Sequence, residues 1–262
     1  RDTLGDIESV CITYGAGGDV SLLGRDVALR DAPGAASPAQ RLACLRTRFT
    51  VECRDERLGP VGVLGALEIG AVGVHNVRNA LAACAVGLCL GMRFSVIAAG
   101  LRQYEGVQRR LQPCGERRGV LVVEDYAHHP TEIMSTLEAV RWIAPRRIIA
   151  VFQPHLYSRT KFFCDDFARA LSTVDRAIVT DIYPSREAPM PGVDACMIVD
   201  AARAAGAQSV DLVRDMRDVP GALADSLEAG DVVLVMGAGN INQICGPLLD
   251  ALEGGDGKGG AA

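Results

Sequence analysis

At 262 residues the chain is long enough to form two domains, each with its own core. Apolar residues make up 49% of it and charged residues 23%, a balance that is typical of globular proteins and excludes a disordered chain. The formal net charge of −5 gives no general affinity for nucleic acid. No apolar run approaches the roughly 20 residues that a membrane-spanning helix requires, so we expect no membrane insertion.

Nine cysteines are scattered along the chain, and no two of them have Cys-x-x-Cys spacing. Their odd number and the apolar surroundings of Cys84, Cys89, Cys164 and Cys245 predict reduced, buried thiols in the cytoplasm. The same pattern argues against a disulfide framework and against a zinc site. The sequence starts at Arg1 without a signal-peptide pattern, so we expect it to be a piece of a longer protein.

The first part of the chain is predicted to be rich in strands. The stretches with a strand pattern are Val10–Tyr14, Arg46–Cys53 and Gly62–Ile69. Between them, Ala32–Ala39 consists of Ala, Pro, Gly and Ser and is predicted to be an exposed loop. Two helices are predicted to follow, Asn76–Leu90 and Ser95–Tyr104, with Ser95 as a candidate N-cap.

The pattern changes at the glycine and arginines of Gly106–Arg110, and we place the domain boundary there. Residues 1–107 are then the first domain and residues 108–253 the second, with Gly106–Gln108 as a hinge. The Gly- and Ala-rich residues 254–262 are predicted to be a disordered tail.

In the second domain, apolar strands alternate with amphipathic helices. The predicted strands are Val120–Asp125, Arg147–Phe152, Ala177–Asp181, Val210–Val213 and Val232–Met236. The predicted helices are Thr131–Ile143, Thr160–Leu171, Val193–Ala204, Val219–Leu227 and Asn240–Leu252. Alternation of this kind predicts an α/β fold with a doubly wound parallel sheet.

Polar side chains gather where the first of these strands ends. Glu124 and Asp125 close the strand, and Tyr126, His128 and His129 follow in a turn before the next helix. An open α/β sheet builds its site at the carboxyl ends of its strands, so the cluster predicts a functional site. For any one of these residues alone, a solvated turn with an acidic N-cap is the preferred interpretation, but not for the whole cluster.

A second polar stretch, Gln153–Thr160, follows the next strand at the same edge of the sheet. His155, Tyr157 and Arg159 alternate in it, so they would face one side of an extended loop. Arg159 could hold a carboxylate or a phosphate with two hydrogen bonds, or it could cap a local carbonyl. Arg147, which begins the strand at the opposite end of the sheet, is expected to be a solvated charge.

Three shorter motifs each have two interpretations. The pair Arg109-Arg110 is either an anion clamp or a solvated charge. Asn76 and Asn79 lie one helical turn apart, where two amides could read an adenine edge or Asn76 could cap the helix. The glycines of Gly237–Asn240 could approach a phosphate or form a tight turn.

Taken together, these stretches resemble the Mur ligase family. The residues that carry the resemblance are His75–Ala80, Gly106–Arg110, Asp125–Glu132, Phe152–His155, Tyr157–Thr160 and Gly237–Asn240, in family order over about the last two-thirds of the chain. Members of the family have an N-terminal UDP-binding domain, a central ATPase domain and a Rossmann-like C-terminal domain. The resemblance implies that this chain begins late in the central domain, without the UDP domain and the phosphate-binding loop. We therefore expect the chain alone not to turn over ATP.

The resemblance also implies roles for matching residues. The residues expected to bind ATP are Asn76, Asn79, Arg110 and Asp125. The residues expected to line the substrate pocket are Tyr126, His128, His155, Tyr157 and Arg159. The candidate catalytic residues are Arg110, Asp125 and His128. The chain departs from the family pattern at Glu124, where Asp is frequent, and at Leu156, where many members have Arg or another polar residue.

The implied activity is the ATP-dependent formation of an amide through an acyl phosphate. The expected substrates are UDP-N-acetylmuramate and L-alanine, and the expected cofactor is Mg²⁺, with its ligands in sequence preceding Arg1 and none in this chain. We expect a cytoplasmic monomer or weak homodimer. A recycling ligase of the same family that attaches a whole peptide is an alternative, and so is a non-catalytic nucleotide-binding module. A sequence before Arg1 with a phosphate-binding loop would exclude the latter.

Overall fold

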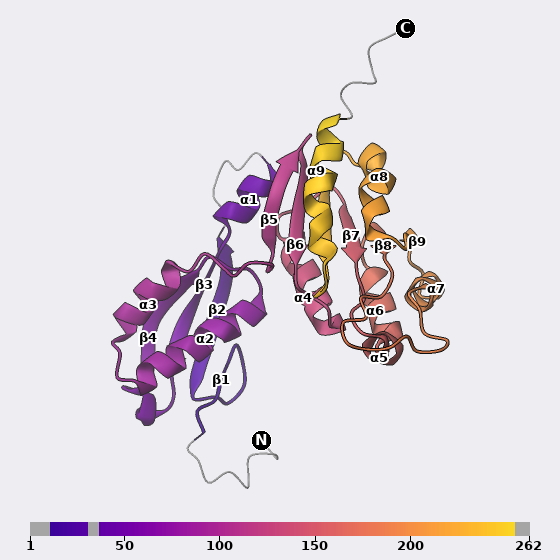
Figure 1. The fold of residues 1–262 in the computed structure, drawn as a ribbon. Helices are drawn as coiled ribbons and strands as arrows, with labels where there is room; N and C mark the ends of the chain where they lie inside the picture. Colours follow the sequence, from indigo (N-terminus) through magenta and orange to yellow (C-terminus); the bar gives the residue numbers. More distant parts are fainter. Residues whose placement is uncertain (1–10, 31–36, 255–262) are drawn as a thin grey trace. The chain divides into compact units, whose positions relative to one another are not determined.

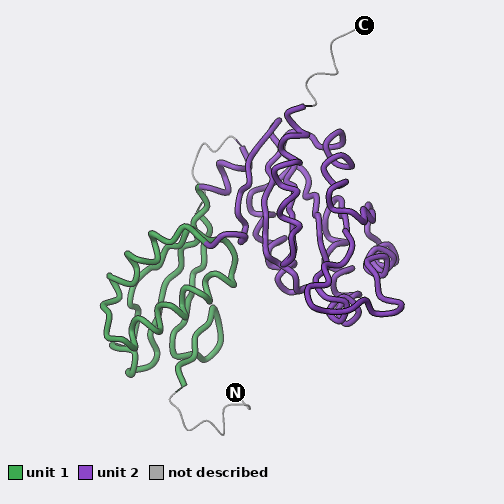
Figure 2. Tube along the Cα trace, in the orientation of Figure 1, with its two compact units in different colours: residues 1–33, 44–106 green, residues 34–43, 107–262 purple. Residues whose placement is uncertain are grey.

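The computed structural model describes residues 11–30 and 37–254. The chain divides into two compact units, one of residues 1–33 and 44–106 and the other of residues 34–43 and 107–262 (Figure 2). The main division between the two units falls after Gly106. Among the described residues, no helix has both the length and the apolar character needed to span a bilayer.

The first unit is a four-stranded sheet covered by two helices (Figure 1). Its strands are β1 (Tyr14–Gly15), β2 (Leu22–Arg30), β3 (Arg46–Cys53) and β4 (Gly62–Ile69), and its helices are α2 (Val74–Cys89) and α3 (Phe94–Arg102), with a short 3-10 turn η1 (Glu56–Leu58). Strands β2, β3 and β4 are antiparallel, and β1 runs parallel to β2. Alternate residues of β3, among them Phe49 and Val51, pack against Val77 and Leu81 of α2.

Two predicted helix starts in this unit are corrected. Helix α2 begins at Val74 with Gly73 as its N-cap, so Asn76 lies inside the helix. Helix α3 begins at Phe94, and its N-cap is Arg93 without a side-chain hydrogen bond, so Ser95 is not the cap.

Part of the predicted exposed loop Ala32–Ala39 is helical. Helix α1 (Pro38–Cys44) begins inside it, while residues 31–36 lie outside the described part of the chain. Residues 34–43 belong to the second unit. The Ala39 amide there donates to Glu116, and the Arg41 guanidinium donates to the Ile143 carbonyl.

The second unit contains a six-stranded sheet in the order β5-β6-β10-β7-β8-β9. Its strands are β5 (Gln112–Arg117), β6 (Val120–Asp125), β7 (Ile148–Phe152), β8 (Arg176–Val179), β9 (Val210–Leu212) and β10 (Val232–Met236). The five strands from β6 onward are parallel, which confirms the predicted α/β fold. Strand β5 was not predicted, because its Pro and Gly obscure the strand pattern, and it pairs antiparallel with β6 at the edge.

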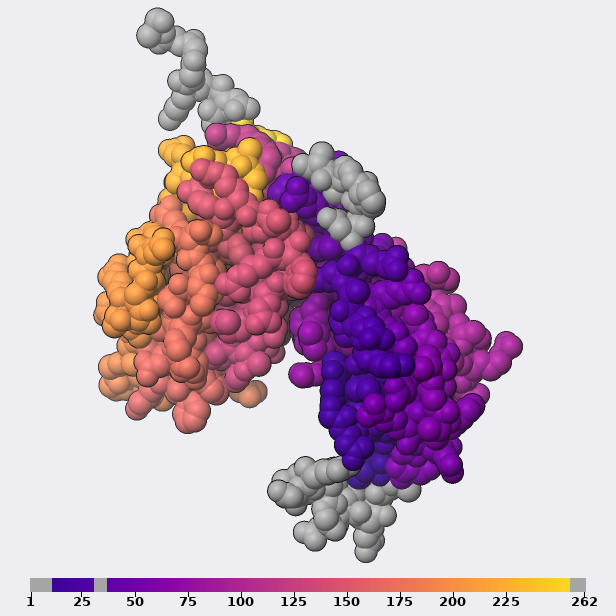
Figure 3. Space-filling view, turned by 180° about the vertical axis from the view of Figure 1, so that it is seen from behind, coloured from indigo at the N-terminus to yellow at the C-terminus, as the bar shows by residue number. Residues whose placement is uncertain are grey.

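Helices cover both faces of this sheet. They are α4 (Pro130–Arg141), α5 (Tyr157–Phe162), α6 (Cys164–Leu171), α7 (Cys196–Ala204), α8 (Val219–Leu223) and α9 (Cys245–Gly254), with 3-10 turns η2 (Met216–Asp218), η3 (Ala224–Ser226) and η4 (Ile241–Ile244). Helices α8 and α9 cover one face (Figure 1), and α4, α6 and α7 cover the face seen in Figure 3. Apart from Gly254, which ends α9, the predicted tail 254–262 lies outside the described residues.

Arg147 is not a solvated charge, contrary to the expectation. Its guanidinium makes two hydrogen bonds, at 2.5 and 3.0 Å, to the fully buried carboxylate of Asp231, which precedes β10. Arg146 adds a third at 3.2 Å. Burial alone would raise the pKa of Asp231, but the hydrogen bonds from Arg147 and its neighbours hold that pKa below its ordinary value. The ion pair fastens β7 to β10 at their amino ends.

The nine cysteines are all free thiols, but they are less uniformly buried than predicted. Cys84 and Cys245 are buried, Cys164 is half-buried and Cys89 is exposed.

Candidate active site

The predicted polar stretches meet at the carboxyl edge of the six-stranded sheet. The loops that leave β6, β7, β8 and β10 all lie at this edge, and β10 separates β6 from β7. The chain crosses over β10 when it passes from β6 to β7, so this edge is the kind of switch point where α/β proteins bind ligands.

Asp125 and Glu124 end β6 on opposite faces of the sheet. Asp125 is 7% exposed, and its carboxylate accepts hydrogen bonds from the amides of Leu111 and Ala127, both at 2.8 Å, and from the Thr136 hydroxyl at 3.3 Å. Burial raises its pKa, although these hydrogen bonds and Arg110 oppose the shift. The carboxylate therefore organises the surrounding backbone.

The turn that Asp125 holds has an unusual backbone. Arg109 and Leu111 have φ of 61° and 45°, values that side chains other than Gly rarely adopt. The Arg109 amide donates to the Gln112 side chain at 2.7 Å, and its carbonyl accepts from the Tyr126 amide at 2.6 Å. Arg110 stands exposed between the two strained residues. Strain that the surroundings maintain in this way is common at ligand-binding turns.

The two arginines of the predicted clamp have different environments. The Arg109 guanidinium donates to the carbonyls of Gly237 and Gly239, at 2.8 and 3.1 Å, and its Cζ lies 4.8 Å from the centroid of the Tyr126 ring. Arg109 therefore fastens the loop after β10 to the loop after β6, as a structural residue. Arg110, by contrast, is exposed, and the buried Nε of Arg109 has no hydrogen-bond partner among the described residues.

Four rings form a row along the edge, each in contact with the next. Tyr126 lies edge-on to His128 with 5.2 Å between ring centroids, and His128 lies edge-on to His155 at 5.9 Å. His155 stacks on Tyr183 at 5.7 Å with an interplanar angle of 15°. At the same edge, a terminal guanidinium nitrogen of Arg159 lies 3.4 Å from Nδ1 of His155. The structure thus brings together four of the five predicted substrate-binding residues.

Hydrogen-bond partners identify which nitrogen of each histidine carries a proton. Nδ1 of His128 lies 2.9 Å from the Tyr126 carbonyl, which can only accept, so Nδ1 carries the proton and neutral His128 has its lone pair on Nε2. Nδ1 of His155 faces the Arg159 guanidinium, which can only donate, so in neutral His155 the proton is on Nε2. One histidine can therefore accept a proton where its neighbour can donate one.

The pKa of His155 lies below its ordinary value. Burial is the main cause; Arg159, His128 and Arg186 also lower this pKa, while the Glu187 carboxylate raises it. His155 therefore remains neutral at neutral pH and can serve as a hydrogen-bond donor to a ligand.

The N-cap of α4 is His129 rather than an acid, which corrects the simpler interpretation of the turn. Nδ1 of His129 accepts from the Thr131 amide at 3.3 Å, and Glu132 accepts from the His128 and His129 amides. With the helix start satisfied in this way, the carboxylate of Asp125 and the ring of His128 are not needed as caps.

The stretch after β7 is not an extended loop, so the predicted alternation of His155, Tyr157 and Arg159 does not apply. Leu156, with φ of 72°, is the N-cap of α5, and the helix begins at Tyr157. Arg159 points back to His155 from the first turn of α5, whereas the Tyr157 ring is outside the described row of rings. Glu187 accepts from both the amide and the hydroxyl of Ser158. Helix geometry therefore separates side chains that an extended loop would align.

Tyr183 was not among the predicted site residues, and Gln153 was named only as part of a motif, without a role. Tyr183 follows β8 at the same edge and pairs with His155 through a parallel bridge, a position that the rule for strand ends could have indicated. Gln153 is buried; its amide donates to Asn240 at 3.1 Å, and its oxygen has no partner among the described residues. A Cβ on Gly239 would lie 2.4 Å from that oxygen, so close packing explains this glycine without a phosphate.

In the first unit, Asn76 and Asn79 lie on one face of α2 as predicted. The Asn79 amide donates to Asn76 at 3.3 Å, and the Asn76 amide donates to the Val72 carbonyl at 2.8 Å. Asn79 is exposed and Asn76 is half-buried. The pair presents a polar surface at the start of the helix.

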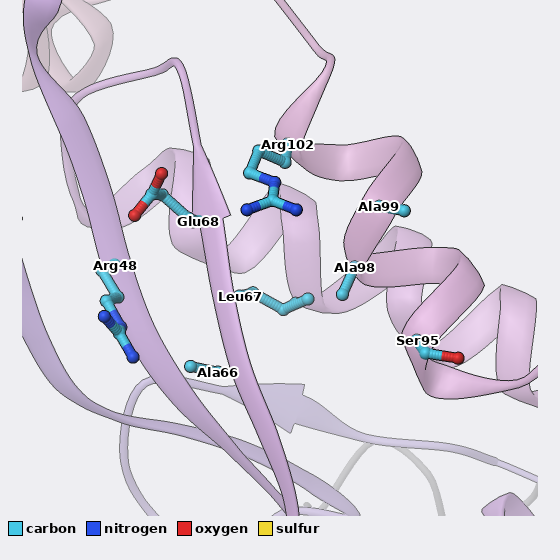
Figure 4. Close-up of a pocket in the computed structure, with 8 residues that line it drawn as sticks. All are labelled: Arg48, Ala66, Leu67, Glu68, Ser95, Ala98, Ala99 and Arg102. Carbon is cyan, nitrogen blue, oxygen red and sulfur yellow. The ribbon is translucent and has the colours of Figure 1, made fainter.

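This unit also has a cavity of about 350 Å³ that contains none of the predicted site residues. Figure 4 shows Arg48 from β3, Glu68 from β4 and Arg102 from α3 around it. The cavity has mixed charge and no aromatic lining, so it indicates no ligand class.

A family model described as "Mur ligase, glutamate ligase domain" matches residues 109–239. A curated UDP-N-acetylmuramate–L-alanine ligase from Salinibacter ruber is 41% identical over 251 residues, which are 95% of this chain and 49% of the relative. One from Streptomyces griseus is 46% identical over 188 residues, 71% of this chain and 40% of the relative. The chain thus spans about half the length of the curated relatives it matches.

Solved structures share the fold. A UDP-N-acetylmuramate–alanine ligase from Thermotoga maritima aligns with a TM-score of 0.72 at 24% identity, over 97% of this chain and 49% of that one. A murein peptide ligase from Psychrobacter arcticus aligns with a TM-score of 0.61 at 22% identity, over 93% of this chain and 46% of that one.

Proposed function

The chain belongs to the Mur ligase family, and we propose that it is part of a UDP-N-acetylmuramate–L-alanine ligase of peptidoglycan synthesis. The observation that carries the proposal is the row of rings at the carboxyl edge, with Arg159 beside it, in a chain whose relatives at 41–46% identity have that name. A ligase that uses ATP and a UDP-sugar works where these nucleotides are present, so we also propose a cytoplasmic location.

The proposed reaction has two steps. A carboxylate oxygen of UDP-N-acetylmuramate attacks the γ-phosphorus of ATP, which releases ADP and leaves an acyl phosphate. The amine of L-alanine then attacks the acyl carbon, phosphate leaves, and the amine nitrogen gives up a proton. The site must therefore hold two anions, exclude water from the acyl phosphate and accept one proton.

The row of rings supplies groups for the second step. Nε2 of neutral His128 is the proposed acceptor for the amine proton, because its Nδ1 is already used by the Tyr126 carbonyl. Arg159 is the proposed partner of the alanine carboxylate, since Leu156 cannot bind one. His155, held neutral by its surroundings, would donate from Nε2 to an oxygen of the substrate.

Nucleotide contacts are proposed for three residues. The amides of Asn76 and Asn79 would read the adenine edge, and Arg110, exposed on its strained turn, would bind phosphate. Asp125 already accepts three hydrogen bonds, so we assign it the positioning of that turn rather than a direct contact.

The same bonds mean that Asp125 does not fit Mg²⁺, which would offset phosphate charge when bound. We therefore propose that residues other than Asp125 would hold this ion.

The experiment is a chimera. This chain replaces the segment of the Salinibacter ruber ligase with which it aligns, and phosphate release is measured with ATP, UDP-N-acetylmuramate and L-alanine. We expect release that depends on all three substrates, and His128→Ala should lower kcat by about 10²–10⁴-fold with a smaller change in KM.

Two results would contradict the proposal. A folded chimera that releases phosphate only with a peptide beginning with L-alanine would indicate the recycling ligase. A folded chimera without release, whose isolated insert still binds ATP, would indicate a nucleotide-binding module. The unmodified relative, assayed in parallel, controls for the substrates.

A further inference from the structure

A group of two cysteines and one glutamate lies on the face of the second unit that α9 covers. The Sγ atoms of Cys114 and Cys245 and a carboxylate oxygen of Glu124 all lie within 4.8 Å of one another. These residues come from β5, α9 and β6. Among the residues that the structure describes, this is the one group of His, Cys, Asp or Glu side chains whose ligand atoms lie close enough together to hold a metal ion. None of the three has a role in the proposed ligase reaction.

Local structure explains why the three side chains converge. The register between β5 and β6 shifts at Pro113 and Gly115, so Cys114 is the extra residue of a bulge and turns toward α9. Helix α9 lies directly on this bulge, since a Cβ on Gly115 would meet Leu249 at 2.9 Å. Glu124 points to the same face because it alternates with Asp125 along β6.

We propose that this group is a binding site for a thiophilic divalent cation such as Zn²⁺. Two thiolates and one carboxylate are ligands that zinc accepts, and three protein ligands leave a fourth position for water. Cys245 is buried, whereas Cys114 and Glu124 are half-buried, so the cation has a path from solvent. Ligand atoms around tetrahedral zinc lie about 3.8 Å apart for Zn–S bonds of about 2.3 Å, which small rotations of the two half-buried side chains can provide.

The surroundings suit such an ion. Two thiolates and a carboxylate carry three negative charges, and the cation neutralises two of them. The nearby Arg109 guanidinium supplies further positive charge. A bound ion would fasten the hairpin of β5 and β6 to α9 and so stabilise the unit against unfolding. This inference does not rest on the proposed ligase function.

The test is a titration of the reduced, metal-free 262-residue chain with Co²⁺, followed by absorption spectroscopy. We expect one equivalent to give a thiolate-to-cobalt band and the visible bands of a tetrahedral site, and Zn²⁺ to displace them. The band should be lost in Cys114→Ser and in Cys245→Ala. In Glu124→Gln the thiolate band should remain, with shifted visible bands and about tenfold weaker binding. Cys89→Ser, at an exposed cysteine of α2, is the matched control and should bind like the original chain.

Thermal melts with and without Zn²⁺ show whether each variant folds. Zinc at a hundred times its dissociation constant should raise Tm by about 5 °C or more in the original chain and not in Cys114→Ser. If Cys245→Ala fails to fold, Glu124→Gln still tests the site, because it changes a half-buried position and should shift the visible cobalt bands. A folded original chain without a cobalt band overturns the proposal, as does a band that persists in Cys114→Ser. A Cys114–Cys245 disulfide formed with diamide, together with no metal binding, would assign the pair to redox chemistry instead.

Discussion

Two arginines at opposite ends of β7 show how the partner of a side chain decides its role. Arg147 binds the buried carboxylate of Asp231 at the amino end of the strand. Arg159 lies beyond the carboxyl end and contacts only a histidine nitrogen at 3.4 Å among the side chains described around it. The first guanidinium is committed to the fold, and the second keeps donors for a ligand.

Replacing these arginines should separate activity from stability. In the chimeric ligase, Arg159→Ala should lower kcat/KM for alanine about ten- to a hundredfold, the value of a charge-assisted hydrogen bond of about 1.5–3 kcal/mol. Arg159→Lys should recover part of the loss, because it keeps the charge without the planar fork. Steady-state kinetics would measure both.

Arg147→Ala is the matched control and should leave kcat/KM unchanged. It should instead lower the free energy of unfolding by about 2–3 kcal/mol, less than for a fully orphaned charge because Arg146 still bonds Asp231. Equal kinetic losses at positions 147 and 159 would show that the site lies elsewhere.

The protonation of His155 gives a test that depends on pH. Its pKa should lie below the ordinary 6.5, as followed by ¹⁵N NMR of the ring nitrogens, with His155→Gln to assign the signals. Because the fold favours the neutral form, this stabilisation is present above pH 6.5 and is lost as the pH falls through the lowered pKa. Arg159→Ala should raise the pKa and Glu187→Gln should lower it further. A pKa that neither variant moves would exclude the arrangement of charges seen here.

At the scale of elements, the turn between β10 and η4 connects the loops that carry the site. Arg109 donates to two of its carbonyls, and Gly239 packs against Gln153 and Tyr183. The stack of Tyr183 on His155 therefore depends on a backbone that has no room for a side chain at position 239.

Alanine at this position should be costly. Gly239→Ala should lower the free energy of unfolding by about 1–3 kcal/mol, because its Cβ would overlap Gln153 and Tyr183. It should also lower the activity of the chimeric ligase by moving Tyr183 away from His155. Urea denaturation and kinetics would measure the two effects.

Gly246→Ala provides the contrast within the same segment. Gly246 lies in α9 with nothing within 4 Å of an added Cβ, so alanine should raise the free energy of unfolding by about 0.5–1 kcal/mol. If both substitutions destabilised the chain alike, the packing at Gly239 would not be the cause.

At the scale of the whole molecule, each unit has its own sheet and its own hydrophobic core. The second unit also includes residues 34–43, but helix α1 buries none of its side chains there and adds only a few hydrogen bonds. The six-stranded sheet and its two helical layers are formed by residues after Gly106.

We therefore expect residues 107–254 to fold without the rest of the chain. This segment should show a single cooperative thermal transition, and adding residues 37–44 in trans should shift its Tm little. Circular dichroism at two wavelengths would measure the transition and its Tm, and dye binding would check for exposed apolar surface. A broad transition with strong dye binding would show that the second unit needs α1 or the first unit.

Local sequence patterns were enough to predict the α/β fold of the second unit and the edge at which its polar residues gather. Its signals there are local: apolar strands such as Val232–Met236 and amphipathic helices repeat at short range, and parallel strands bring their carboxyl ends together. That is why His128, His155 and Arg159 could be assigned to one site. Strand β5 was not predicted, because the Pro and Gly at its bulge interrupt the strand pattern.

The contacts of individual side chains could not be predicted in this way, because those partners are distant in sequence. Arg109 bonds carbonyls of the loop after β10, Arg147 finds Asp231, and Tyr183 stacks on His155. Spacing along the chain likewise argued against a metal site, since no motif joins Cys114 to Cys245. Packing of α9 on the bulge of β5 places their sulfur atoms together, and such packing depends on side chains that no local pattern relates.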